Sequence, residues 1–209
     1  MIHHDFEMSP EAFEAEKAWP IKGTRDWKGA FASQSPLNRM HVVADGRGAN
    51  GTAGYLALVG EASDQFYAEA TPRWHRPREA LDLRDTRASV SLKAITPIRV
   101  NAGYTPHLFV ADYDEATHTY CGWRHRQVLE VGDEWTLNTI ELADDETRWS
   151  FRDRSVTVQG HRPLGAVLSR VGFIGIIYHR DGAHTGVGAT GVLGIDEFCY
   201  GMPVRSTAF

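Results

Sequence analysis

The chain has 209 residues, of which 42% are hydrophobic and 23% charged, and its formal net charge is −5 at pH 7. A chain of this length buries a full core without disulfides or metal, and we expect residues 1–209 to form a single domain. A net negative chain has no long-range attraction for phosphate backbones, so the charge argues against a nucleic-acid partner.

The sequence contains no apolar run of the roughly 20 residues that a transmembrane helix needs, so we expect no membrane partner. The segment from Met1 to Glu7 has neither the basic nor the apolar region of a signal peptide. These features predict either a cytoplasmic protein or a trimmed secreted product. Two cysteines, Cys121 and Cys199, are too few for a disulfide scaffold, and they are interpreted as buried thiols or as one bridge.

Taken in chain order, the expected elements begin with a short strand within residues 2–7 and one helix over residues 9–19. Ser9 is a suitable N-cap, Pro10 fits the first helical position, and Glu11 places an acid in the first turn. A loop with three glycines over residues 44–51 separates strands expected at 40–43 and 54–60. Further strands are expected at 66–70, 80–83, 88–94, 107–111, 119–124, 135–142, 171–178 and 192–200.

This pattern predicts an all-β protein. Six Trp, seven Tyr and nine Phe residues accompany 20 glycines, and few segments show a long helical period. About ten short strands at this spacing are typical of a β-sandwich. The jelly roll is favoured over the immunoglobulin fold because the chain is about twice as long as the latter requires.

Three fragments occur in an order seen in one class of β-sandwich: Asp5-Phe6-Glu7, the strand–loop–strand segment 42–58, and Gly194-Ile195-Asp196-Glu197-Phe198. The arrangement resembles the galactose-binding-like jelly roll of carbohydrate-binding modules of polysaccharide-degrading enzymes. The chain departs from that class by being longer and by an inserted stretch around residues 148–165. The resemblance implies that the first and last strands lie side by side and that the protein binds an oligo- or polysaccharide.

The same resemblance implies a structural calcium ion. Ca²⁺ prefers six to eight oxygen ligands and combines carboxylates with backbone carbonyls. Glu7 and Asp196 would supply the charge, and carbonyls of Asp5 and of the glycine-rich loop, where Asp45 and Asn50 lie, would complete the shell. The alternative is that these carboxylates are ordinary surface groups at strand ends.

Carbohydrate recognition requires aromatic platforms and convergent planar hydrogen-bonding groups. On the strand around Trp123, alternation places Tyr120, Gly122, Arg124 and Arg126 on one face, and Cys121, Trp123 and His125 on the other. The first of these faces is predicted to contact the ligand, although core packing remains an alternative for each aromatic residue. The full set of predicted ligand-binding residues is Trp74, Tyr104, Tyr120, Arg124, Arg126 and Tyr178.

Two other functions remain open. A small jelly-roll enzyme acting on a polysaccharide, a lyase or a glycoside hydrolase, would use Tyr178 and His179 for proton transfer and Arg124 to neutralise a uronate carboxylate. The strand motifs typical of jelly-roll alginate lyases are absent from the sequence. Alternatively, an accessory subunit would use the same face against a protein partner or a second copy of the chain.

Overall fold

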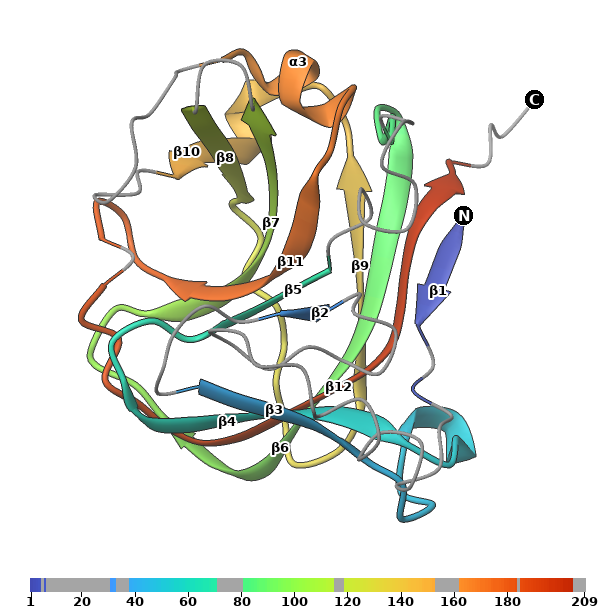
Figure 1. Cartoon of the computed structure of the whole chain (residues 1–209), viewed down its shortest axis with the longest axis vertical. Helices are drawn as coiled ribbons and strands as arrows, with labels where there is room; N and C mark the ends of the chain where they lie inside the picture. Colours follow the sequence, from blue (N-terminus) through green and yellow to red (C-terminus); the bar gives the residue numbers. More distant parts are fainter. Residues whose placement is uncertain are drawn as a thin grey trace.

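Two antiparallel sheets pack face to face in the computed structural model (Figure 1), which describes residues 1–4, 6, 31–32, 38–70, 81–114, 119–152, 162–183 and 185–204. The helix predicted over residues 9–19 lies outside these residues. The predicted all-β jelly-roll sandwich is confirmed. Within the described part of the chain, no helix is long and apolar enough to cross a membrane.

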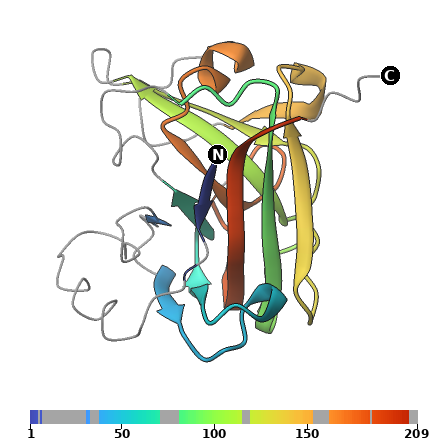
Figure 2. The same ribbon diagram turned by 90° about the vertical axis from the view of Figure 1, so that its right-hand side faces the viewer.

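The first sheet, sheet A, has six strands in the order β3-β4-β12-β6-β9, with β1 also paired to β12. Figure 2 shows β12, β6 and β9 side by side along this sheet. Its strands are β1 (Ile2–His4), β3 (Asn38–Val43), β4 (Tyr55–Ser63), β6 (Thr86–Arg99), β9 (Thr136–Leu142) and β12 (Ala189–Pro203).

The second sheet, sheet B, has six strands in the order β10-β8-β7-β11-β5-β2. Neighbouring strands pair antiparallel throughout. Its strands are β2 (Phe31–Ala32), β5 (Tyr67–Ala70), β7 (Thr105–Asp114), β8 (Thr119–His125), β10 (Trp149–Arg152) and β11 (Phe173–His179).

The core lies between the two sheets because alternate side chains of each strand point inward. On β6, Ala88, Val90 and Leu92 alternate with more polar residues, and all three are fully buried in the main cluster. On β7, Leu108 and Val110 belong to the same cluster. The short helix α3 (Leu164–Leu168), which the sequence analysis did not predict, adds three buried side chains to this core.

The first and last strands pair as the resemblance implied: Ile2, His3 and His4 lie opposite Tyr200, Cys199 and Phe198. A β-bulge interrupts β12 between Asp196 and Cys199, and Glu197 there has a φ of 49°. An extra residue in a strand reverses which side chains face inward. Leu193 and Ile195 therefore enter the core before the bulge, and Phe198 and Tyr200 enter it after the bulge. Cys121 and Cys199 are not joined by a disulfide, and Cys121 is buried.

Candidate functional site

The face of sheet B that points away from sheet A carries a concentration of polar side chains at one end. Cys121 and Trp123 of β8 belong to the core, whereas Arg124 reaches side chains of the outer face. His107 of β7 alternates with the core residue Leu108 and therefore also lies on the outer face. The alternation predicted for β8 thus agrees with the structure at these positions.

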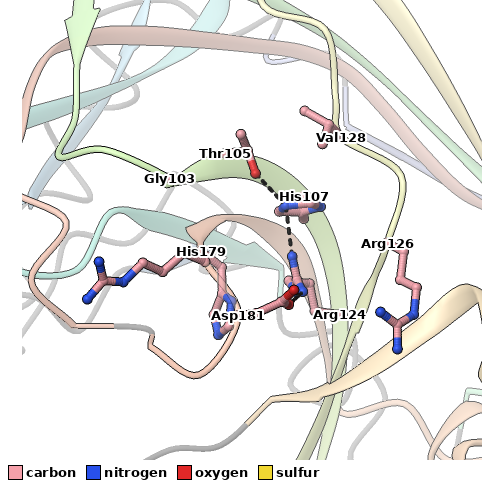
Figure 3. A pocket seen from close by; sticks show the side chains of 9 residues that line it. Gly103, Thr105, His107, Arg124, Arg126, Val128, His179 and Asp181 are labelled. Atoms are coloured by element: carbon pink, nitrogen blue, oxygen red, sulfur yellow. Dashed lines mark hydrogen bonds and ion pairs between the residues drawn. The ribbon is translucent and has the colours of Figure 1, made fainter.

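A pocket of about 240 Å³ opens at this end of sheet B (Figure 3). Its walls come from the start of β7, the end of β8 with the loop that follows, and the end of β11 with the turn that follows. The charged or ionisable residues that line the pocket are His107, Arg124, Arg126, His179, Arg180 and Asp181. Since three of these are arginines and one is an aspartate, the pocket is basic although the chain as a whole is acidic.

His107 is held in one tautomer by its neighbours. Its Nδ1 lies 3.0 Å from the carbonyl oxygen of Gln127, so Nδ1 carries the proton and donates it to this acceptor. Its Nε2 then accepts from the Arg124 guanidinium at 2.9 Å and from the Thr105 hydroxyl at 2.8 Å. Burial, followed by the charge of Arg124, lowers the pKa of His107 to about 4. The ring is therefore neutral at pH 7, and its Nε2 is the acceptor that orients Arg124.

Arg124 is the most constrained cation of the pocket, with only 6% of its side chain exposed. Its Nε and Nη2 donate to the Ser150 hydroxyl at 3.1 and 2.8 Å, and Nη2 also donates to the carboxylate of Asp181. Together with the bond from Nη1 to His107, these contacts use four of the five guanidinium N–H groups. One N–H of Nη1 has no partner among the described residues. Burial lowers the pKa of Arg124, although Asp181 opposes this effect.

The other two arginines of the pocket are exposed. Arg126 donates through Nε to the carbonyl oxygen of Trp149 at 2.9 Å. The Arg180 guanidinium lies over the ring of Tyr104, 5.1 Å from the centroid, in a cation–π contact. Neither arginine forms an ion pair with a carboxylate of the described residues.

The structure places the predicted ligand-binding residues in different environments. Arg124 and Arg126 line the pocket. Tyr120, 3% exposed, packs against Phe173 with ring centroids 6.2 Å apart. Tyr104 belongs to the core cluster and donates its hydroxyl to the Thr185 carbonyl. Trp74 lies outside the described residues.

Tyr178 also belongs to the core, where its ring packs 5.2 Å from that of Phe66 and burial raises the pKa of its hydroxyl. Since Tyr178 and His179 are consecutive in β11, their side chains point to opposite faces of sheet B. His179 lines the pocket with Arg124, and Tyr178 does not. The structure therefore separates Tyr178 from His179 and Arg124, the other residues proposed for an enzyme reaction. Residues that are adjacent in the sequence of a strand lie on opposite faces of its sheet.

Sequence reasoning missed two residues that fix Arg124, namely Ser150 and Asp181. Ser150 lies in β10, within a hydrophilic stretch to which no strand was assigned. Asp181 lies in the turn that follows β11, and Gly182 beside it has a φ of 76°. The Asp-Gly pair two residues after the apolar run 171–178 was the available signal, because this pair is typical of turns at strand ends.

A second polar cluster lies where the glycine-rich loop meets β12. Asp196 is fully buried, and its Oδ2 accepts from the Ala49 N–H at 2.7 Å and from the Thr52 hydroxyl at 2.6 Å. Its Oδ1 accepts from the Glu197 N–H at 2.8 Å. Burial raises the pKa of Asp196 to about 6, although these hydrogen bonds oppose the effect.

Three acceptor oxygens of this cluster converge on the Thr52 hydroxyl. The Thr52 Oγ1 lies 2.6 Å from Asp196 Oδ2, 2.8 Å from the Ala49 carbonyl oxygen and 3.4 Å from the Gly54 carbonyl oxygen. Asp196 Oδ2 and the Ala49 carbonyl oxygen each also accept from a backbone N–H, that of Ala49 and that of Thr52 respectively. A Cβ atom at Gly48 would lie 2.6 Å from the Gly54 oxygen and 2.8 Å from Asp196 Oδ2. Convergent oxygens beside a buried carboxylate are the donor set that Ca²⁺ prefers.

Two of the other predicted calcium ligands, Asp45 and Asn50, belong to the described residues. Asp45 accepts from the Arg47 Nε at 2.7 Å, and Asn50 is exposed at the tip of the loop. Asp5 and Glu7 lie outside the described residues, but the carbonyl oxygen of Phe6 between them lies against Gly54. Among the described side chains, no group of three or more His, Cys, Asp or Glu residues is arranged to hold a metal ion.

No protein-family model and no curated protein sequence matches the chain. Among solved structures, the chain is similar to the CBM22-1 and GH10 modules of xylanase 10B from Clostridium thermocellum, complexed with xylohexaose. The TM-score is 0.52 and the identity 14%, over 94% of this chain and 27% of that one.

The chain is also similar to the family 11 carbohydrate-binding module from Clostridium thermocellum in complex with a β-1,3-1,4-mixed-linked tetrasaccharide. The TM-score is 0.51 and the identity 10%, over 80% of this chain and 84% of that module. At these identities the similarity concerns the fold. The described strands therefore form a jelly-roll sandwich similar in fold to these two structures.

Proposed function

We propose that this protein binds a glycan at the pocket on the outer face of sheet B. The observation that carries the proposal is the fixed orientation of Arg124, whose guanidinium is buried and held by His107, Ser150 and Asp181. A polar group that is already oriented loses little entropy when it binds a ligand, so its hydrogen bonds contribute fully to affinity and specificity. Structures of similar fold were solved with xylohexaose and with a mixed-linked tetrasaccharide.

The chemistry of the pocket suits a saccharide because sugar hydroxyls bind planar groups with several donors and acceptors. Arg124 and Arg126 offer guanidinium N–H groups, and Thr105 lies beside them on β7. An aromatic platform for the apolar face of a sugar ring remains a prediction, which Trp74 would fulfil. The proposed site on sheet B therefore recognises the hydroxyl groups and the charge of a sugar.

The test is a panel of soluble polysaccharides, including xylan and mixed-linkage glucan, examined by affinity gel electrophoresis. Retarded migration on at least one member is the expected result. Each mixture is also assayed for new reducing ends and for ultraviolet-absorbing unsaturated products, whose appearance would replace the binding proposal by the enzyme alternative. Unchanged migration on every polysaccharide would contradict the proposal and favour an accessory subunit with a protein partner.

We also propose that a structural Ca²⁺ binds where the glycine-rich loop meets β12. The Asp196 carboxylate and the carbonyl oxygens of Ala49 and Gly54 would hold it, with Glu7 as a second carboxylate. The bound ion would supply positive charge to a buried carboxylate and would link the segment after β1 to β12. The supporting observation is the convergence of these oxygens around Thr52 Oγ1, beside a fully buried carboxylate.

The calcium proposal is tested by equilibrium dialysis against ⁴⁵Ca²⁺ and by thermal unfolding with and without a chelator. We expect one bound ion per chain and a higher midpoint of unfolding in calcium. An unchanged midpoint together with no retained ⁴⁵Ca²⁺ would remove the ion from this account.

A further inference from the structure

The ion pair between Arg124 and Asp181 is unusually asymmetric. The Arg124 side chain is 6% exposed, whereas the Asp181 side chain is 82% exposed. Arg124 is also fixed from the sheet by Ser150 and His107, while Asp181 extends from the turn that follows β11 (Figure 3). An exposed partner on a turn is bound weakly, because water competes for it and ordering it costs entropy. Arg124 therefore stays in place, whereas another anion can replace the Asp181 carboxylate.

The pocket retains excess positive charge when this ion pair is counted. Arg124, Arg126 and Arg180 face one carboxylate, that of Asp181, among the residues that line it. The His107 ring is neutral at pH 7 because its pKa lies near 4. Two unneutralised guanidinium groups beside a buried one form a site whose electrostatic potential attracts an anion, in a chain whose net charge is −5.

We propose that this pocket binds the carboxylate of an acidic sugar residue, which replaces Asp181 on Arg124. This inference rests on the proposed function, since it specifies the class of glycan that the same pocket binds. A carboxylate has two oxygens, and Arg124 offers two N–H groups: the one that Asp181 accepts and the one on Nη1 without a partner among the described residues. Asp181 shows that a carboxylate already fits this position, which favours a uronate over a sulfate ester.

The test compares three acidic polysaccharides, polygalacturonate, glucuronoxylan and alginate, each with its own carboxyl-reduced form. The reduced forms keep the glycosidic linkages and lose only the charge. We expect at least one acidic form to bind about tenfold more tightly than its reduced form, and we expect this preference to decline between 50 and 500 mM NaCl. A sulfated galactan and its desulfated form provide the arm that distinguishes sulfate esters.

Each result separates the two proposals. Equal affinity for the acidic and reduced forms would overturn the carboxylate inference and leave glycan binding intact. A preference for the sulfated galactan without a preference for any uronate would also overturn it. Absence of binding to every member would overturn the inference, and it would overturn the proposed function only if xylan and mixed-linkage glucan also fail to bind.

Two exposed residues allow a test by substitution with little risk to folding. Asp181→Asn removes the internal competitor and should raise the affinity for the acidic form about three- to tenfold. Arg126→Gln removes one unneutralised charge and should lower the ratio of acidic to reduced affinity by a similar factor. Arg84→Gln and Asp82→Asn are matched controls, because these residues form an exposed ion pair outside the pocket and should leave the ratio unchanged. An unchanged ratio in both pocket variants would contradict the inference.

Discussion

Asp196→Asn is the substitution whose effect is most fully determined by the structure. Oδ2 of Asp196 accepts from two donors and Oδ1 from a third. An amide in either orientation places its NH₂ group against a donor, and such a mismatch at a buried site costs about 1–3 kcal/mol of folding free energy. The asparagine variant is therefore less stable at acidic pH, where the wild-type carboxyl is protonated.

The difference in the free energy of unfolding between the wild type and Asp196→Asn depends on pH. Burial raises the pKa of Asp196 from 3.8 to about 6, so the folded state binds its proton more tightly than the unfolded state. The stability gained from this preference is fully present below pH 4 and is lost as the pH rises through 6. The loss is on the order of 2–3 kcal/mol. Asparagine does not titrate, so in a chelator the stability difference should narrow by about that amount between pH 4 and pH 7.

The assay is urea denaturation of both proteins at each pH, with chelator or with calcium. Because the difference is taken at each pH, the titration of His107 and His125, whose pKa values burial lowers to about 4, cancels. Calcium at pH 7 should widen the difference again, since only the carboxylate provides a charged ligand. The exposed Asp82→Asn variant is the control. A difference that is the same at pH 4 and pH 7 in chelator would refute the reasoning.

The remaining predictions concern single side chains. Gly48→Ala should cost about 2 kcal/mol or more in urea denaturation, because the new Cβ would lie 2.6 Å from the Gly54 carbonyl oxygen. Gly46→Ala, with a φ of 73° but open space around it, should cost only about 1 kcal/mol, and equal costs would contradict the crowding argument. His107→Phe removes the acceptor for Arg124 and should destabilise the fold by about 1–3 kcal/mol. As the pH falls from 6.5 toward 4, this variant should lose less stability than the wild type, because it has no imidazole at this position to protonate on unfolding. Identical acid sensitivity of the two proteins would contradict the pKa argument. Tyr178→Phe should leave glycan affinity unchanged in affinity gels, and a loss of binding would return this residue to the site.

The fold was predictable because its signals are local or periodic. The alternation of Ala88, Val90 and Leu92 with polar residues required one buried face, and the structure buries that face completely. The pairing of the first and last strands came instead from the resemblance of the terminal fragments to a known fold. The helix α3 was not predicted, because five residues are too few to show a helical period.

The site was only partly predictable, because it depends on contacts between distant segments. Alternation along one strand assigned Arg124 to the outer face of sheet B. Alternation could not show that Asp181, 57 positions later, would reach the same guanidinium. Tyr178 illustrates the opposite error: its aromatic and basic neighbours in sequence suggested a ligand contact, yet the strand turns its ring into the core.

The central claim is that glycan binds on the outer face of sheet B, and amide chemical-shift mapping tests it most directly. Backbone resonances are assigned and then followed during titration with an oligosaccharide of the best-retarded polysaccharide. The account predicts the largest shifts at Thr105 and His107, at Arg124 and at His179–Asp181, which lie on three neighbouring strands of one sheet or in the turn that follows β11. Shifts centred instead on sheet A, around Trp135 and the glycine-rich loop, would contradict it.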